Sequence, residues 1–174
     1  MLYAHWEGWV KALARLYIAY VDQQKLRYDD LNEAFLGIAL RTRLEMIGEA
    51  KAAATHNDFA SFVIGGGLAS PAPLSLSVVR TEGNLSSAVM RDIVTRLGVP
   101  YQPYELFAAL IDERLVRARN TIAHGDHLEV TVSSYEDLHA RVIRMLNAYT
   151  IDVLNAAATQ AYRRPVLPAT SPAP

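Results

Sequence analysis

Residues 104–124 read YELFAALIDERLVRARNTIAH. Apolar side chains recur through this stretch at intervals of three or four residues, the spacing that places them on one face of an α-helix. They are Phe107, Ile111, Leu115, Ala118 and Ile122. Pro103 suits the first turn of such a helix, and Gly125 suits its end. The stretch therefore predicts a long amphipathic helix.

The chain before this helix also carries helical patterns. Residues 2 to about 22 repeat apolar side chains at helical spacing, with further apolar residues on neighbouring faces, so we expect a largely buried helix. Asp29 or Asp30 can cap a second long helix that extends to about Phe62. Three glycines and two prolines then interrupt the pattern, which predicts a long loop at about 64–84.

Two further helices complete the pattern. Asn84 can cap a short helix that stops at Gly98, and Ser133 with Glu136 forms a capping box for a long last helix. The run 128–132 is the one segment that could pair locally as a strand. We therefore predict an all-α fold, a four-to-five-helix up-and-down bundle over residues 1–163, followed by a proline-rich flexible tail, 164–174.

Composition narrows the class of protein. The chain has 174 residues, 51% of them hydrophobic, which suits one domain with a sizeable core. The net charge of −1 gives no overall field that would attract nucleic acid, and the absence of cysteine fits a reducing compartment. Charged residues interrupt the first helix as a membrane span, so we expect a cytoplasmic protein without membrane contact.

The polar residues near the end of the predicted helix 104–124 form the most site-like cluster. Arg117, Arg119, Asn120 and His124 fall within eight residues and are suited to binding a phosphate and moving a proton near neutral pH. On an ideal helix Arg119 and His124 do not share a face. They could converge if the helix unwinds at residues 123–125, or if a second copy of the chain supplies one of them.

This cluster resembles a known signature. Arg119 to His124 is similar to the Arg-x4-His motif of HEPN domains, the higher-eukaryote and prokaryote nucleotide-binding family. Residues 4–9, Ala-His-Trp-Glu-Gly-Trp, resemble one bacterial HEPN-like nuclease subfamily. With the segments 81–85 and 122–125, the resemblance spans most of residues 2–155.

The resemblance implies a homodimer that cleaves RNA without a metal or another cofactor. Two facing motifs would form one site, in which His124 transfers protons and Arg119 stabilises charge on the phosphate. Attack by the ribose 2′-hydroxyl would leave a 2′,3′-cyclic phosphate. Asn120 and Arg117 are candidate substrate contacts, as are Arg141 and Arg144. Glu7 and Lys11 match a Glu-x3-Lys pattern found in some family members.

The resemblance also bears on biological role. Many members are toxins or defence effectors, so an antitoxin or a defence complex is an expected partner. Members that are inactivated by adenylylation carry a tyrosine two residues after the histidine, where this chain has Asp126. The helical pattern begins at residue 2, so either a preceding helix is absent or dimerisation completes the bundle.

Plainer interpretations remain open at this stage. His124 could only neutralise a helix end while Arg119 covers the edge of the core, and Glu7 with Lys11 could be an ordinary helix salt bridge. The two histidines His124 and His127 with Asp126 make a conceivable metal site, but helix spacing does not bring a third ligand into place, so we predict no metal site. The main functional alternative is a non-catalytic HEPN module that binds RNA, a nucleotide or a partner protein, and a further one is a helical subunit of a larger complex.

Overall fold

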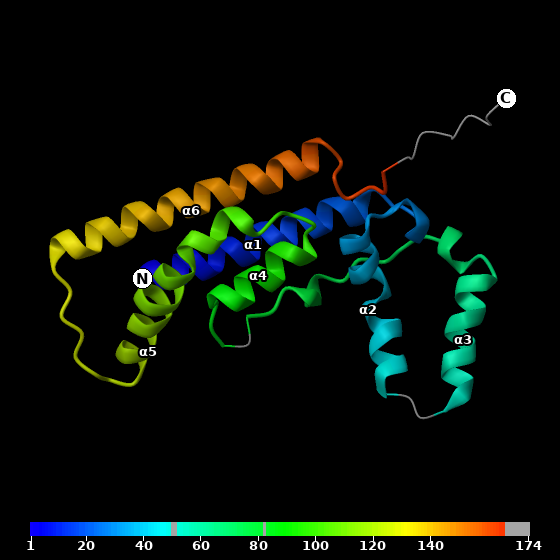
Figure 1. Cartoon of the computed structure of the whole chain (residues 1–174), viewed down its shortest axis with the longest axis horizontal. Helices are drawn as coiled ribbons and strands as arrows, with labels where there is room; N and C mark the ends of the chain where they lie inside the picture. The colour runs from blue at the N-terminus through cyan, green and yellow to red at the C-terminus, as the bar shows by residue number, and fades with distance from the viewer. Residues whose placement is uncertain (50–51, 82, 166–174) are drawn as a thin grey trace.

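The computed structural model describes residues 1–49, 52–81 and 83–165 (Figure 1). Its α-helices are α1 (Leu2–Gln23), α2 (Glu33–Glu49), α3 (Ala53–Ile64), α4 (Ser87–Arg96), α5 (Arg117–Ala123) and α6 (Val132–Ala158). Short 3-10 helices lie at Tyr28–Asp30, Gly67–Ala69, Leu76–Val78 and Gln102–Phe107, and a π-helix lies at Leu110–Val116. The all-α prediction is confirmed. The run 128–132 forms no strand and leads instead into α6, which corrects that expectation.

The two longest helices, α1 and α6, lie side by side and run in the same direction (Figure 1). Near their middle, the indole Nε1 of Trp9 donates a 3.0 Å hydrogen bond to the Thr150 hydroxyl. Farther along α1, the ring centroid of Tyr17 lies 6.4 Å from that of Tyr162, in the segment that follows the end of α6. Later residues of α1 thus contact later residues of the chain around α6, as expected for two parallel helices.

A continuous apolar core fills the space between these helices and the segments packed on them. From α1 the core takes one helical face: Trp6, Val10, Ala14, Tyr17, Ile18 and Val21. From α6 it takes Val142, Met145, Tyr149 and Val153, again at helical spacing. Burial of these side chains is the main source of stability, at about 1.5–3 kcal/mol for each large apolar residue.

The stretch 102–123 is helical throughout and contains three kinds of helix. It begins as a 3-10 helix, continues as the π-helix Leu110–Val116 and ends as α5. Ile111 and Leu115 are buried, as the apolar spacing predicts, but Ile122 is 64% exposed. A π-helix widens the turn and shifts the faces that follow it, so α5 presents a different side to the core from the one an unbroken α-helix would present.

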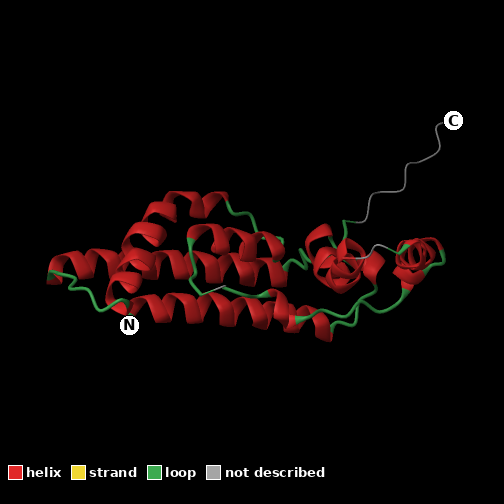
Figure 2. Ribbon diagram, turned by 90° about the horizontal axis from the view of Figure 1, so that it is seen from below, coloured by secondary structure: helices red, strands yellow, loops and turns green. Residues whose placement is uncertain are grey.

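The expected second long helix is two helices. Asn32, not Asp29 or Asp30, caps α2: its side-chain oxygen accepts a 2.9 Å hydrogen bond from the Phe35 amide. The buried residues of α2 all lie in its first half, and α3 has none. Figure 2 shows α2 and α3 nearly end-on, so this hairpin runs across the direction of α1 and α6.

Two other caps differ by a few residues from the sequence-based expectation. Ser86 caps α4 by accepting from the Val89 amide, and Thr131 caps α6 by accepting from the Ser134 amide. Neighbouring Ser, Thr and Asn residues compete for such a position, so residue type alone does not choose among them. The long loop before α4 is present, interrupted by two short 3-10 turns.

The end of the described chain folds back onto the domain. The Tyr162 side chain is fully buried, and the Arg164 amide donates a 2.9 Å hydrogen bond to the Asp30 carbonyl. Residues 166–174 of the expected tail lie outside the described residues. Across residues 1–49, 52–81 and 83–165, none of the helices combines the length and the apolar character needed to cross a bilayer.

Candidate functional site

The C-terminal end of α5 is built by Gly125. This glycine adopts a φ of +83°, and the amides of Gly125 and Asp126 donate to the carbonyls of Ile122 and Thr121 over 3.1 Å each. Glycine reaches this left-handed conformation without strain, which makes it the common residue just past a helix end. The predicted stop is therefore confirmed, and His124 becomes the cap residue of α5.

Arg119 and His124 are both exposed at this end of α5, but they do not meet within one chain. His124 keeps helical backbone angles, so the turn does not unwind to bring its imidazole toward Arg119. Among the described residues no hydrogen bond or ion pair joins the two side chains. Of the two ways sequence reasoning left open for them to converge, local unwinding is not observed.

Asn120 ties Arg119 to a distant part of the chain. The Arg119 Nη1 atom donates a 3.0 Å hydrogen bond to the Asn120 side-chain oxygen. The same oxygen accepts a 3.3 Å hydrogen bond from the side-chain amide of Asn84, which lies in the loop before α4. Asn120 is thus half-buried between its own helix and that loop, and it orients the neighbouring guanidinium.

Glu7 and Lys11 on α1 form a second polar cluster together with Thr81. The Lys11 ammonium lies 3.4 Å from the Glu7 carboxylate, so the helix salt bridge is present. Buried Thr81, only 7% exposed, donates a 2.7 Å hydrogen bond to the same carboxylate. Partial burial alone raises the pKa of Glu7, but the Thr81 hydrogen bond and the Lys11 charge hold that pKa below its ordinary value.

Tyr3 completes this side of α1. Its hydroxyl accepts a 2.6 Å hydrogen bond from the Leu85 amide, and burial raises its pKa. Sequence reasoning missed Tyr3 and assigned no chemical role to Thr81. One signal was available: Tyr3, Glu7 and Lys11 are spaced by four, which lines up polar groups along one face of a mostly apolar helix.

Comparison with known proteins assigns the chain to a family. A family model described as HEPN_MAE_28990-like HEPN matches residues 1–162. The chain belongs to this HEPN family. Neither the curated proteins nor the solved structures contain a match to the chain. The HEPN domain thus covers nearly all described residues, from α1 to the buried Tyr162.

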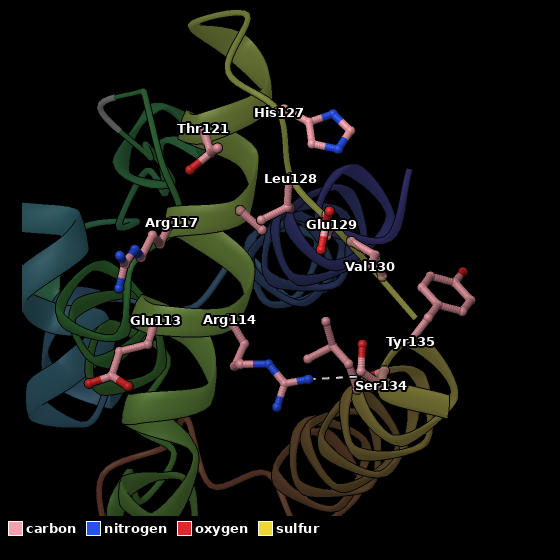
Figure 3. Close-up of a pocket in the computed structure, with 12 residues that line it drawn as sticks. Glu113, Arg114, Arg117, Thr121, His127, Leu128, Glu129, Val130, Ser134 and Tyr135 are labelled. Atoms are coloured by element: carbon pink, nitrogen blue, oxygen red, sulfur yellow. Dashed lines mark hydrogen bonds between the residues drawn. The ribbon is translucent and has the colours of Figure 1, made fainter. Parts of the chain in front are cut away.

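Arg117 lies apart from Arg119 in the HEPN domain, on a groove between α5 and the start of α6. The groove has a volume of about 460 Å³ and is lined by two arginines, two glutamates and a histidine among others: Glu113, Arg114, Arg117, His127 and Glu129. Figure 3 shows Arg114 reaching across it to the Ser134 carbonyl, a hydrogen bond of 3.2 Å. The mixed charges suit a polar ligand but do not select an anion.

The remaining candidate contacts of the HEPN domain lie on α6. Arg141 is exposed and forms a 3.0 Å ion pair with Asp137 one turn earlier, and Arg144 is exposed. Within the part of the chain that the structure describes, no three His, Asp or Glu side chains are grouped as ligands of one metal ion. The polar side chains around Arg119 include those of Asn120 on α5, Asn84 in the loop before α4 and Tyr3 on α1.

Proposed function

We propose that this HEPN domain is a metal-independent endoribonuclease whose site is shared by two copies of the chain. The observation that carries the proposal is the pair Arg119 and His124, both solvent-exposed at the end of α5 in a HEPN domain, with the guanidinium oriented by Asn120. A phosphate can reach both groups from solvent. We further propose that the protein acts in the cytoplasm as a toxin or defence effector, restrained by an antitoxin or complex subunit.

In this proposal, His124 and Arg119 supply all the groups that RNA cleavage requires. One His124 imidazole removes the proton from the ribose 2′-hydroxyl, whose oxygen attacks the adjacent phosphorus. The phosphorus–5′-oxygen bond breaks, and the imidazole of the second copy protonates the leaving oxygen. Arg119 stabilises the negative charge that grows on the phosphoryl oxygens, a contribution of about 3 kcal/mol by analogy with oxyanion holes.

Support for a second copy comes from the apolar surface beside Arg119. A groove next to this residue is lined by Ile122, Leu128 and Val130, together with Leu2 and Tyr3 of α1. Ile122 and Val130 are more than half exposed in the single chain. Covering such side chains favours association, and contact through this groove would bring the ends of two α5 helices close together.

The proposal is tested with purified protein on single-stranded RNA in the presence of EDTA. We expect cleavage by the wild type, and a loss of at least a hundredfold in His124→Ala and Arg119→Ala, as is usual for removed acid–base and oxyanion groups. His56→Ala and Arg96→Ala, which alter an exposed residue on α3 and a partly exposed residue on α4, serve as matched controls and retain activity. Cleavage unchanged in the first two variants would remove these residues from the mechanism.

A non-catalytic HEPN module is the second candidate. It is favoured by the absence, among the described residues, of a hydrogen bond or ion pair between Arg119 and His124. Such a module would bind RNA, a nucleotide or a partner protein with these side chains and release it unchanged. Saturable RNA binding without products at any pH between 5 and 9 would favour this candidate over the nuclease.

A further inference from the structure

The loop before α4 connects the two polar clusters described above. Thr81 contacts Glu7 and Lys11 on α1, while Asn84 contacts Asn120 on α5. The Asn84 backbone amide donates a 2.9 Å hydrogen bond to the Thr81 carbonyl, which joins the two residues. A continuous path of hydrogen bonds thus runs from α1 to the guanidinium of Arg119.

We propose that Thr81 and Asn84 are positioning residues, which anchor Asn120 to α1 and thereby fix the direction of the Arg119 guanidinium. This inference rests on the proposed function, because it assigns these residues a part in the same site. The anchor is rigid for a physical reason. Thr81 is buried and donates over 2.7 Å to a carboxylate, and charge-assisted hydrogen bonds of this kind are short and strong.

The geometry at Asn120 makes the direction of Arg119 depend on Asn84. The Asn120 oxygen accepts from Asn84 on one side and from Arg119 on the other. When Asn84 is lost, the amide of Asn120 can rotate and exchange its oxygen for its NH2 group, which has no acceptor to offer a guanidinium. Arg119 would then lose its fixed partner and sample several rotamers in solvent.

The contacts of Asn84 speak against a purely local role in the loop. If Asn84 served only as a helix cap, its side chain would accept from the first turn of α4. That place belongs to Ser86, whose hydroxyl accepts from the Val89 amide. The Asn84 side chain points instead to α5, and its own oxygen is buried without a hydrogen-bond partner among the described residues. A buried oxygen without a partner lowers stability. A residue that served only the loop would not need to bury it.

The experiment measures the mobility of the Arg119 side chain as well as RNA cleavage. In Thr81→Val and Asn84→Ala we expect the ¹⁵N order parameter of the Arg119 Nε to fall, with kcat for RNA cleavage lowered roughly tenfold to hundredfold and KM within about twofold, as for a misplaced catalytic group. Thr81→Ser, which retains the hydroxyl, restores both readouts. Thr95→Val and Asn147→Ala, at exposed positions of α4 and α6, are the matched controls and change neither.

Each outcome separates this inference from the proposed function. An unchanged Arg119 order parameter in both variants overturns the positioning role, even if the wild type cleaves RNA. A wild type that does not cleave RNA overturns the nuclease, while the NMR measurement still decides whether the anchor orients Arg119. Urea unfolding identifies any variant that is unfolded, and Asn84→Ala, at a partly exposed residue, keeps the test decisive if Thr81→Val does not fold.

Discussion

The guanidinium of Arg119 donates a 3.0 Å hydrogen bond to the side-chain oxygen of its neighbour Asn120. Adjacent residues on a helix point in directions about 100° apart, so such a bond requires both side chains to bend toward each other. A flexible arginine held in this way loses much of its rotamer freedom before any ligand arrives. Asn120 thus holds Arg119 in one direction on α5, and Thr81 separately holds Glu7 and Lys11 on α1.

Removal of the Asn120 amide should therefore weaken catalysis more than stability. For Asn120→Ala we expect kcat for RNA cleavage to fall roughly tenfold to hundredfold, since a hydrogen bond to a charged group contributes about 1.5–3 kcal/mol. The free energy of unfolding should fall by only about 1 kcal/mol. Steady-state kinetics and urea unfolding measure the two effects. Equal activity in Asn120→Ala and wild type would contradict the role of Asn120 in orienting Arg119.

The Glu7 carboxylate should make stability depend on pH. Its folded-state pKa lies below the ordinary value of 4.5, so its contribution is fully present above pH 4.5 and is lost as the pH falls through the folded-state pKa. We expect wild type to be more stable than Glu7→Gln at pH 7, with the difference shrinking below pH 4.5. Urea unfolding from pH 7 to pH 3 measures this.

Glu136→Gln, at an exposed position in the first turns of α6, is the matched control for that titration. It removes a carboxylate without a hydrogen bond to a buried side chain, so its stability should follow wild type across the range. A constant difference between wild type and Glu7→Gln from pH 7 to pH 3 would mean that the Glu7 carboxylate is not held by Thr81 and Lys11.

Two tryptophans on α1 allow a matched test of the core. Trp6 is 0% exposed, and Trp9, three residues later, is 50% exposed. We expect Trp6→Ala to lower the free energy of unfolding by about 3–5 kcal/mol, the usual cost of removing a large buried aromatic side chain. Trp9→Ala should cost about 1 kcal/mol, mainly through its hydrogen bond to Thr150. Similar losses in both variants would contradict the observed orientation of α1, in which Trp6 is buried in the core and Trp9 is half exposed.

The groove beside Arg119 gives a test of dimerisation. Ile122→Asp places a charge on the proposed contact surface without touching the core, since Ile122 is largely exposed. We expect analytical ultracentrifugation to show a shift from dimer to monomer, with RNA cleavage reduced in parallel and the free energy of unfolding of the single chain little changed. Leu106→Asp, at a more exposed residue away from the groove, is the control. A wild type that is monomeric at all concentrations would contradict a shared site.

The helical fold is readable from the sequence because its cause is local. Trp6, Val10 and Ile18 repeat on one face of α1, and Met145 and Tyr149 do the same on α6, so apolar spacing identifies both helices. The π-helix was not predictable in this way, since a one-residue widening of a turn leaves the average spacing nearly unchanged. The exposure of Ile122 follows from that widening.

The candidate site was predictable only in part. The spacing of Arg119 and His124 in the sequence points to these two residues as candidates, but contacts between residues far apart in the chain set the geometry around them. Thr81 meets Glu7 across 74 residues and Asn84 meets Asn120 across 36, and no local periodicity encodes either pair. Such contacts depend on how the loop before α4 packs between α1 and α5.

The most direct test of the nuclease is the chemistry of its products. The substrate is a pool of single-stranded DNA oligonucleotides of random sequence, each with one ribonucleotide, incubated with the protein and EDTA and analysed by mass spectrometry. We expect cuts only after the ribonucleotide, with 2′,3′-cyclic phosphate and 5′-hydroxyl ends, and none with His124→Ala. Cuts between deoxynucleotides, 5′-phosphate ends, or no cuts in this pool and in all-RNA strands would contradict attack by the 2′-hydroxyl at a site formed by Arg119 and His124.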